Sequence, residues 1–205
     1  MLVLEAICHK TIWGGSRLAK LADLPDQKIG HLYSVFCRKN ISNRILNGKW
    51  KGEFLNDTFP LWKSDFQMEQ YDFFPLTLAL TEAHEHLSIQ VHPDDAAADK
   101  LEHLARGKRE SWYFLSPPSA GYIYNGCSCR DESERDYLIQ EERYFDLTDR
   151  LKVKRGDYIF VEPGTLHAIT AGSLVYEIEE GADFTYRFFD FGRVDEEGNP
   201  RELHI

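Results

Sequence analysis

Residues 157–191 read DYIFVEPGTLHAITAGSLVYEIEEGADFTYRFFDF, and this stretch decides the fold class. Four short segments rich in β-branched and aromatic residues follow one another in it, with Gly164, Gly172 and Gly181 between them. Such residues favour strands, and glycines at these intervals mark the turns that separate strands. The stretch therefore predicts consecutive β-strands with tight connections.

Similar short segments lie upstream, at IGHLYSVF (29–36), SWYFL (111–115) and AGYIYN (120–125). Many short strands punctuated by turns are typical of a β-sandwich or a jelly-roll barrel. The chain has 205 residues, 42% of them hydrophobic, which is enough for one domain with a substantial core. We therefore expect a mostly β single domain over 1–205, with an N-terminal arm at 1–60 and the jelly-roll core at 74–193.

The segments outside these strands carry weaker signals. An Asn-Gly turn is expected at 47–48, and residues 57–73 predict a helix or a packed aromatic loop. Residues 93–106 predict a helix, because acidic residues lie in its first turn and Gly107 is expected to end it. The tail at 194–205 is expected to be a hairpin or a loose end.

Charge and composition exclude several classes of protein. The net charge of −10 argues against non-specific binding to nucleic acid or to anionic membranes. Neither a bilayer-spanning apolar run nor a signal peptide is recognisable. Four cysteines, including a Cys127-x-Cys129 pair, are expected to be reduced thiols, which is typical of the cytoplasm.

Three separate segments carry side chains that bind metals. Alternation over 87–92 places Ser88, Gln90 and His92 on one face of a strand. Glu110 heads the 111–115 strand, and His167 follows a Pro-Gly turn. Two imidazoles, a carboxylate and an amide form a mixed nitrogen and oxygen set that suits zinc, manganese, cobalt or ferrous iron. Taken singly, a histidine is more often a surface or a hydrogen-bonded core side chain, and Gln90 alone would indicate nothing.

Four blocks carry a resemblance to a known family: LSIQVHPDD (87–95), GKRESWYFL (107–115), GDYIFVEPGTLHAI (156–169) and FTYRFFDFGR (184–193). In this order and at these separations they resemble the signature blocks of class I mannose-6-phosphate isomerases, also called phosphomannose isomerases. The resemblance implies a cupin-type double-stranded β-helix, or jelly roll, in a short single-cupin form. An N-terminal arm and a few short helices would complete it.

The resemblance also implies roles for particular residues. It implies metal ligands at Gln90, His92, Glu110 and His167. It implies a phosphate contact at Ser88 and catalytic roles for Lys108, Glu177 and Arg187. Lys108 and Arg187 would also bind the substrate.

These residues make chemical sense for an aldose–ketose isomerase. The reaction moves a proton between C1 and C2 of an open-chain sugar through an enediol. One divalent metal, expected to be zinc, would stabilise the developing oxyanion, and a base is needed within about 3 Å of the proton. Glu177 and Lys108 are both candidates for this base. Lys108 and Arg187 would attract the phosphate, and Arg109 or Arg193 are further candidates for this role.

The chain departs from the family's pattern at several positions. Ala79 stands where relatives commonly have lysine, and HLYSV (31–35) replaces a Glu-Ser-Trp-Glu segment. His84 and His86 form a His-x-His pair of the kind that binds metal in other cupins. They are therefore a rival metal site.

We expect a cytoplasmic enzyme that interconverts mannose 6-phosphate and fructose 6-phosphate. One alternative is a non-catalytic regulatory cupin that binds metal and a sugar phosphate. Another is a different cupin enzyme, such as an oxygenase or an epimerase, because a fold does not fix its chemistry. The expected partner is a hexose 6-phosphate, not nucleic acid or a membrane, and a homodimer is left open.

Overall fold

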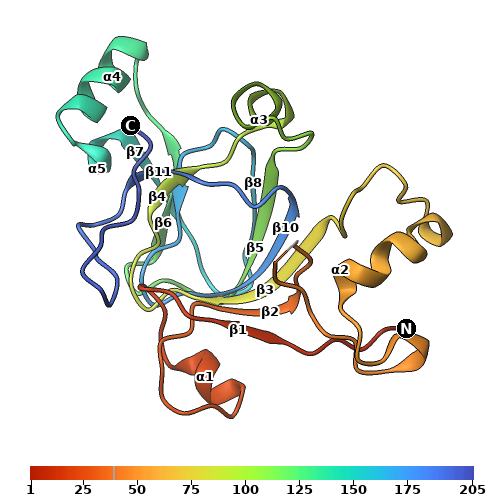
Figure 1. Cartoon of the computed structure of the whole chain (residues 1–205). Coiled ribbons are helices and arrows are strands. Elements are labelled where there is room, and N and C mark those ends of the chain that lie inside the picture. The colour runs from red at the N-terminus through yellow and green to blue at the C-terminus, as the bar shows by residue number, and fades with distance from the viewer. Residues whose placement is uncertain (39) are drawn as a thin grey trace.

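Two antiparallel sheets face each other in the computed structural model, which describes residues 1–38 and 40–205 (Figure 1). The six-stranded sheet has the order β1 (Ile7–His9), β2 (His31–Val35), β3 (Leu76–Glu82), β10 (Leu174–Gly181), β5 (Lys108–Ser116) and β8 (Tyr158–Val161). The five-stranded sheet has the order β11 (Tyr186–Phe189), β4 (Ile89–Val91), β9 (His167–Ala168), β6 (Tyr122–Cys127) and β7 (Thr148–Lys152). This arrangement confirms the prediction of a mostly β fold built from two sheets.

The helices are short and lie outside the sheets (Figure 1). The α-helices are α1 (Arg17–Leu21), α2 (Leu55–Thr58), α3 (Asp95–Glu102), α4 (Glu132–Gln140) and α5 (Tyr144–Leu147). Three 3-10 turns are η1 (Gly48–Trp50), η2 (Phe59–Leu61) and η3 (Lys63–Phe66). Within the described residues, none of the helices has the length and apolar character needed to cross a membrane.

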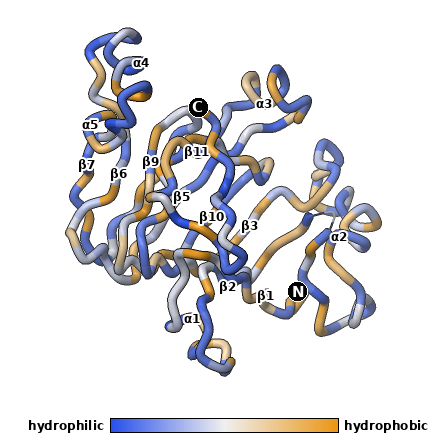
Figure 2. Tube along the Cα trace, turned by 60° about the vertical axis from the view of Figure 1, so that its left-hand side comes forward, coloured by the Kyte–Doolittle hydropathy of each residue, from blue (hydrophilic) through white to orange (hydrophobic). Residues whose placement is uncertain are grey.

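Side chains along β5 and β10 point alternately into and out of the barrel, and the inward ones form an apolar part and a polar part. Trp112, Phe114 and Val175 point inward and are at most 1% exposed, in a core that both sheets contribute to. Toward the other end of the same strands the inward positions are charged, with Glu110 and Glu177 among them. Figure 2 shows hydrophobic stretches along the strands interrupted by hydrophilic positions. The apolar core thus supports a buried polar chamber.

Helices cover part of the outer face of each sheet. Leu18 and Ala19 of α1 pack with Leu80 on the large sheet. Leu138 of α4 and Tyr144 of α5 pack over the small sheet, in a second apolar cluster that also contains Ile89. These contacts bury the second face of central strands, which would otherwise expose aliphatic side chains to water.

Every strand expected from the sequence is present, but the predicted helix at 93–106 was too long. Helix α3 starts after Asp94, whose carboxylate accepts a hydrogen bond from the Ala97 amide at 2.7 Å. It ends at Glu102, because His103 adopts a left-handed conformation with φ of 56°. Gly107 is therefore not the stop signal. A Cβ at Gly107 would come within 2.2 Å of the Pro93 carbonyl oxygen, so close packing explains this glycine.

Other segments contain more structure than their sequence indicated. Residues 57–73 form short helical turns whose aromatic rings pack together, with Phe59 and Trp62 centred 5.1 Å apart. Helices α4 and α5 and strand β7 lie in a region without a sequence prediction. Strands β1 and β2 extend the large sheet through the pairing of β2 with β3. The division into an arm at 1–60 and a core at 74–193 stays a prediction.

Two neighbouring aromatic residues of β5 test this account of the core. Phe114→Ala should lower the free energy of unfolding by about 3–5 kcal/mol, because it leaves a cavity in a close-packed interior. Tyr113→Ala should cost about 1 kcal/mol or less, because the Tyr113 side chain points outward. Denaturant unfolding followed by circular dichroism would compare them. Equal losses would contradict the assignment of the two faces.

Candidate metal centre and active site

Two histidines and one glutamate converge inside the polar part of the barrel. His92 follows β4, His167 begins β9 and Glu110 lies on β5. The Nε2 atoms of His92 and His167 lie 3.1 Å from Glu110 Oε2 and Oε1, respectively. All three side chains are buried, and their ligand atoms lie within 4.8 Å of one another. This histidine–glutamate cluster unites three of the residues expected to bind metal.

Sheet topology explains how distant segments meet here. Strand β8 pairs with β5 in the large sheet, while β9 pairs with β4 in the small sheet. The Pro163-Gly164 turn between β8 and β9 therefore carries the chain from one sheet to the other. His167 at the start of β9 then pairs in register with Gln90 and faces Glu110 across the barrel.

The remaining ring nitrogens are bonded to the main chain. His92 Nδ1–H donates to the Phe184 carbonyl and His167 Nδ1–H donates to the Thr165 carbonyl, both at 2.8 Å. A neutral ring whose proton lies on Nδ1 keeps a lone pair on Nε2. Burial, assisted by Lys108, lowers the pKa of His92 to about 4, so this ring is neutral near pH 7. Such hydrogen bonds orient histidines for metal binding.

A divalent cation would resolve the electrostatic conflict within this cluster. Two Nε2 lone pairs face a carboxylate, and among the described residues Glu110 Oε1 is buried without a hydrogen-bond partner. Burial alone would raise the pKa of Glu110, but His92 and Lys108 outweigh it and hold the pKa well below its usual range. Glu110 is therefore a buried anion with spare acceptor capacity. Together with two imidazole nitrogens it fits zinc or a related ion.

Gln90 is placed to supply a fourth ligand. Its Nε2 lies 3.5 Å from His92 Nε2 and 3.4 Å from His167 Nε2, while the Ser88 hydroxyl donates to its Oε1 at 2.8 Å. A half-turn of the carboxamide exchanges its oxygen and nitrogen. The oxygen would then face the cation, and the nitrogen would donate to Ser88 Oγ. The strand alternation predicted for Ser88, Gln90 and His92 thus brings all three to one side.

Lys108 lies next to this cluster, between two carboxylates. Its Nζ is 2.8 Å from Glu179 Oε1 and 3.4 Å from Glu110 Oε2. Burial would lower the pKa of Lys108, but Glu179 and Glu110 outweigh it and hold the pKa well above its usual range. Lys108 is therefore an ammonium ion at neutral pH, and it acts as a hydrogen-bond donor.

Glu177 is held by two hydrogen-bond donors. Trp112 Nε1–H donates to Oε1 at 2.9 Å, and the Thr81 hydroxyl donates to Oε2 at 2.6 Å. His31 Nδ1 lies 3.0 Å from Thr81 Oγ1 and continues this chain of contacts. Burial, together with Glu179 and Glu110, raises the pKa of Glu177 to about 8. A fixed carboxyl that titrates near neutral pH is suited to proton transfer.

A cavity of about 240 Å³ opens onto these groups. Its walls include Ser88, Gln90, Lys108, Glu110, Glu177 and Arg187, all of which were singled out from the sequence. The two further candidates for binding phosphate, Arg109 and Arg193, form ion pairs elsewhere. Arg109 pairs with Asp95 at 3.0 Å, and Arg193 pairs with Asp190 at 2.5 Å. Neither is among the residues that line the cavity.

Sequence patterns did not indicate several residues that line this cavity, among them His31, Glu179 and Arg201. Strand alternation could have indicated Glu179, because it lies two positions after Glu177 on the same face of β10. His31 reaches the cavity because β2 pairs with β3, which is a long-range contact. Arg201 lies in the tail, where no local pattern singles it out.

The rival histidine pair does not form a cluster. His86 Nδ1 accepts a hydrogen bond from the Ala171 amide at 3.0 Å, and its ring stacks on Phe191. His84 is exposed. Within the described part of the chain, neither belongs to a group of side chains that could hold a metal. The Sγ atoms of Cys127 and Cys129 lie 3.0 Å apart as free thiols.

Replacing Glu110 tests the metal centre directly. Glu110→Gln removes the only carboxylate of the histidine–glutamate cluster, so the purified protein should lose nearly all bound zinc. Zinc should then no longer raise its melting temperature, as it should for the unchanged protein. Elemental analysis and thermal unfolding measure both effects.

Glu179→Gln is the matched control, because Glu179 belongs to a second buried carboxylate group, with Glu110 and Glu177, and not to the group that contains the two histidines. It should keep its zinc. Zinc loss in both variants would place the ion among the three carboxylates instead.

Comparison with known proteins adds independent information. Residues 1–111 match the family model described as phosphomannose isomerase type I, catalytic domain. The chain is 35% identical to mannose-6-phosphate isomerase from Streptococcus mutans and 34% identical to that from Bacillus subtilis, in both cases over 100% of its own length. It spans 65% of the length of each of these relatives.

A solved structure agrees with the sequence comparison. The crystal structure of the mannose 6-phosphate isomerase from Bacillus subtilis superposes with a TM-score of 0.91 at 33% identity, over 99% of this chain and 65% of that one. The resemblance drawn from four sequence blocks is therefore confirmed, and so is the cupin-type fold that it implied. On the family model and this shared architecture, the chain belongs to the type I phosphomannose isomerase family.

Proposed function

We propose that the protein is a metal-dependent aldose–ketose isomerase that interconverts mannose 6-phosphate and fructose 6-phosphate. The observation that carries this proposal is the histidine–glutamate cluster, whose Glu110 lines a cavity together with Lys108 and Arg187. Such a cavity offers metal ligands for the carbonyl end of a sugar and cations for its phosphate. The family membership of the chain supports the same reaction.

We propose zinc as the ion, because two imidazoles, a carboxylate and an amide oxygen suit its coordination. When bound, the ion supplies Lewis-acid stabilisation for negative charge that develops on O1 or O2 of the sugar. His92, His167 and Glu110 would hold it, with Gln90 as the fourth ligand. The main-chain hydrogen bonds of the two rings keep their Nε2 atoms directed at it.

Glu177 is our candidate for the base that moves the proton between C1 and C2. Its pKa of about 8 lies near neutral pH, and the hydrogen bonds from Trp112 and Thr81 fix its carboxylate at the cavity wall. Lys108 carries a proton that Glu179 and Glu110 stabilise, so it is poorly suited to accept another. As an ammonium group it would donate a hydrogen bond to the enediol oxygens or to the phosphate.

The location and partners of the protein complete the proposal. The free thiols accord with a reducing compartment, and we propose the cytoplasm. The substrate partner is a hexose 6-phosphate. A homodimer stays a prediction.

An activity assay combined with Arg187→Ala tests the reaction. Fructose 6-phosphate formed from mannose 6-phosphate should appear with zinc, manganese or cobalt and disappear after chelation. Arg187→Ala should keep its metal, because Arg187 is not a ligand, and should lose about 100-fold or more in kcat/KM. A protein that binds metal and sugar phosphate without turnover would be a regulatory cupin. Oxygen consumption at an electrode would instead indicate an oxygenase.

The identity of the base is tested by Glu177→Gln and Lys108→Gln. Glu177→Gln should lower kcat by roughly 10²–10⁴-fold while zinc content and KM stay close to normal. Glu180→Gln is the control: Glu180 follows Glu179 directly on β10, lies on the opposite face of the strand and does not line the cavity, so this variant should keep full activity. Incorporation of solvent deuterium into the sugar, followed by NMR, reports proton transfer. Exchange that persists in Glu177→Gln but vanishes in Lys108→Gln would assign the base to Lys108.

A further inference from the structure

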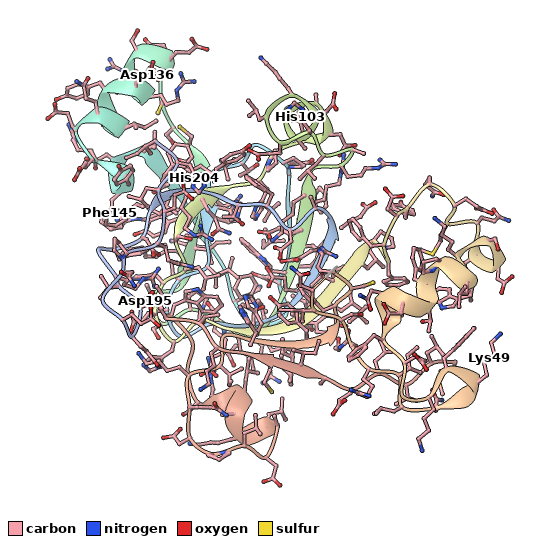
Figure 3. The ribbon with its side chains drawn as sticks, in the orientation of Figure 1. Lys49, His103, Asp136, Phe145, Asp195 and His204 are labelled. Atoms are coloured by element: carbon pink, nitrogen blue, oxygen red, sulfur yellow. The ribbon has the colours of Figure 1, made fainter. Side chains whose placement is uncertain are left out.

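The tail of the chain folds back and brings Arg201 to the cavity. The backbone turns between Val194 and Pro200, which form an isolated β-bridge. His204, labelled in Figure 3, then joins the segment to β11: its amide donates to the Arg187 carbonyl at 2.7 Å, and its Nδ1 accepts from the Arg187 amide at 3.1 Å. As a result Arg187 and Arg201, which are 14 positions apart in sequence, line the same cavity.

Asp190 fixes the orientation of the Arg201 side chain. Arg201 Nε donates to Asp190 Oδ2 at 2.7 Å, and Arg201 Nη2 donates to Asp190 Oδ1 at 2.5 Å. Asp190 is buried, so this two-pronged contact is shielded from water. These two bonds use N–H groups on Nε and Nη2, and the other N–H groups of the guanidinium do not bind Asp190. Arg201 is thus held in place without using all of its donors.

The same carboxylate also binds Arg193, whose Nη2 lies 2.5 Å from Asp190 Oδ1. Two guanidinium ions therefore share one carboxylate, and the trio carries a net positive charge. Of the two arginines, only Arg201 is among the residues that line the cavity. Arg193 also lies 4.0 Å from Glu85 Oε2, so it has a second carboxylate partner, and the guanidinium charge that Asp190 must share is that of Arg201 on the cavity side.

Arg187 adds a second cation with an open donor. Among the described residues, its Nε is buried without a hydrogen-bond partner. A buried N–H without an acceptor is costly, and an anion in the cavity would satisfy it. Two guanidinium groups that line one cavity, one of them with an orphaned donor, supply the type of donor with which proteins bind phosphate.

The rest of the cavity is less favourable for an anion. Its remaining charged walls carry Glu110, Glu177, Glu179 and Asp183, and Lys108 is already paired with two of these carboxylates. A dianionic group would be repelled there. Burial and the nearby charge of Arg201 lower the pKa of Arg187, so the two positive charges lie close together and attract an anion most strongly.

We propose that Arg201 binds the phosphoryl group of the substrate together with Arg187, as an anion-binding residue supplied by the C-terminal segment. The inference rests on the proposed function in that the phosphoryl group is taken to be that of a hexose 6-phosphate. The anion site itself is defined by Arg187, Arg201 and Asp190. It can therefore be tested without turnover.

The experiment compares Arg201→Gln with Arg193→Gln in the zinc-loaded full chain. Both substitutions remove a guanidinium partner of Asp190, but only Arg201 faces the cavity. Binding of inorganic phosphate and of mannose 6-phosphate is measured by calorimetry, beside zinc content and melting temperature. Arg201→Gln should weaken both ligands by about tenfold or more and raise KM with a smaller effect on kcat. Arg193→Gln should bind both ligands normally, and Arg201→Lys should recover part of the affinity.

The outcomes separate this inference from the proposed reaction. Normal phosphate affinity in Arg201→Gln, even with a lower melting temperature, would show that Arg201 only anchors the tail and would overturn the inference. Absence of phosphate binding by the unchanged protein would also overturn it. If the unchanged protein lacks isomerase activity but Arg201→Gln still loses phosphate affinity, the anion site stands and the proposed reaction fails.

Discussion

The buried carboxylate of Glu110 is the group on which the rest of the site depends. It is 3% exposed, and a charge in that position must be compensated by its surroundings. His92 and His167 approach its two oxygens, and Lys108 lies 3.4 Å from one of them. Each of these partners is itself buried and needs a further contact. The histidines use main-chain carbonyls, and Lys108 uses Glu179.

This chain of requirements explains why polar and apolar residues are separated along the same strands. In β5, Trp112 and Phe114 close the apolar core, while Lys108 and Glu110 occupy the inward positions nearer the strand's start. Trp112 belongs to both parts, because its ring packs in the core and its indole N–H donates to Glu177. The charged chamber reduces the apolar area that the interior can bury. The helices that cover the outer faces offset this loss with two further apolar clusters.

Much of the site could be predicted because its ligands lie in strands with clear alternation or next to strong turn signals. Ser88, Gln90 and His92 share a face by the geometry of a strand alone, and the Pro163-Gly164 turn marks where His167 begins the next one. The helix at 93–106 was overestimated for a comparable reason. Its composition favours a helix throughout, whereas the left-handed residue His103 and the packing of Gly107 against Pro93 depend on neighbouring segments.

The amino-acid sequence by itself determined the run of strands, the chemical types of the metal-binding side chains and the family. These are properties of local alternation, turn residues and motif order. Only the tertiary structure decided which cations serve the cavity: Arg109 and Arg193 are paired elsewhere, whereas Arg201 arrives from the tail. It also decided that Lys108 is locked between Glu110 and Glu179. The physical reason is that charge pairing depends on distances of 3–4 Å between segments far apart in sequence, and no local pattern encodes these distances.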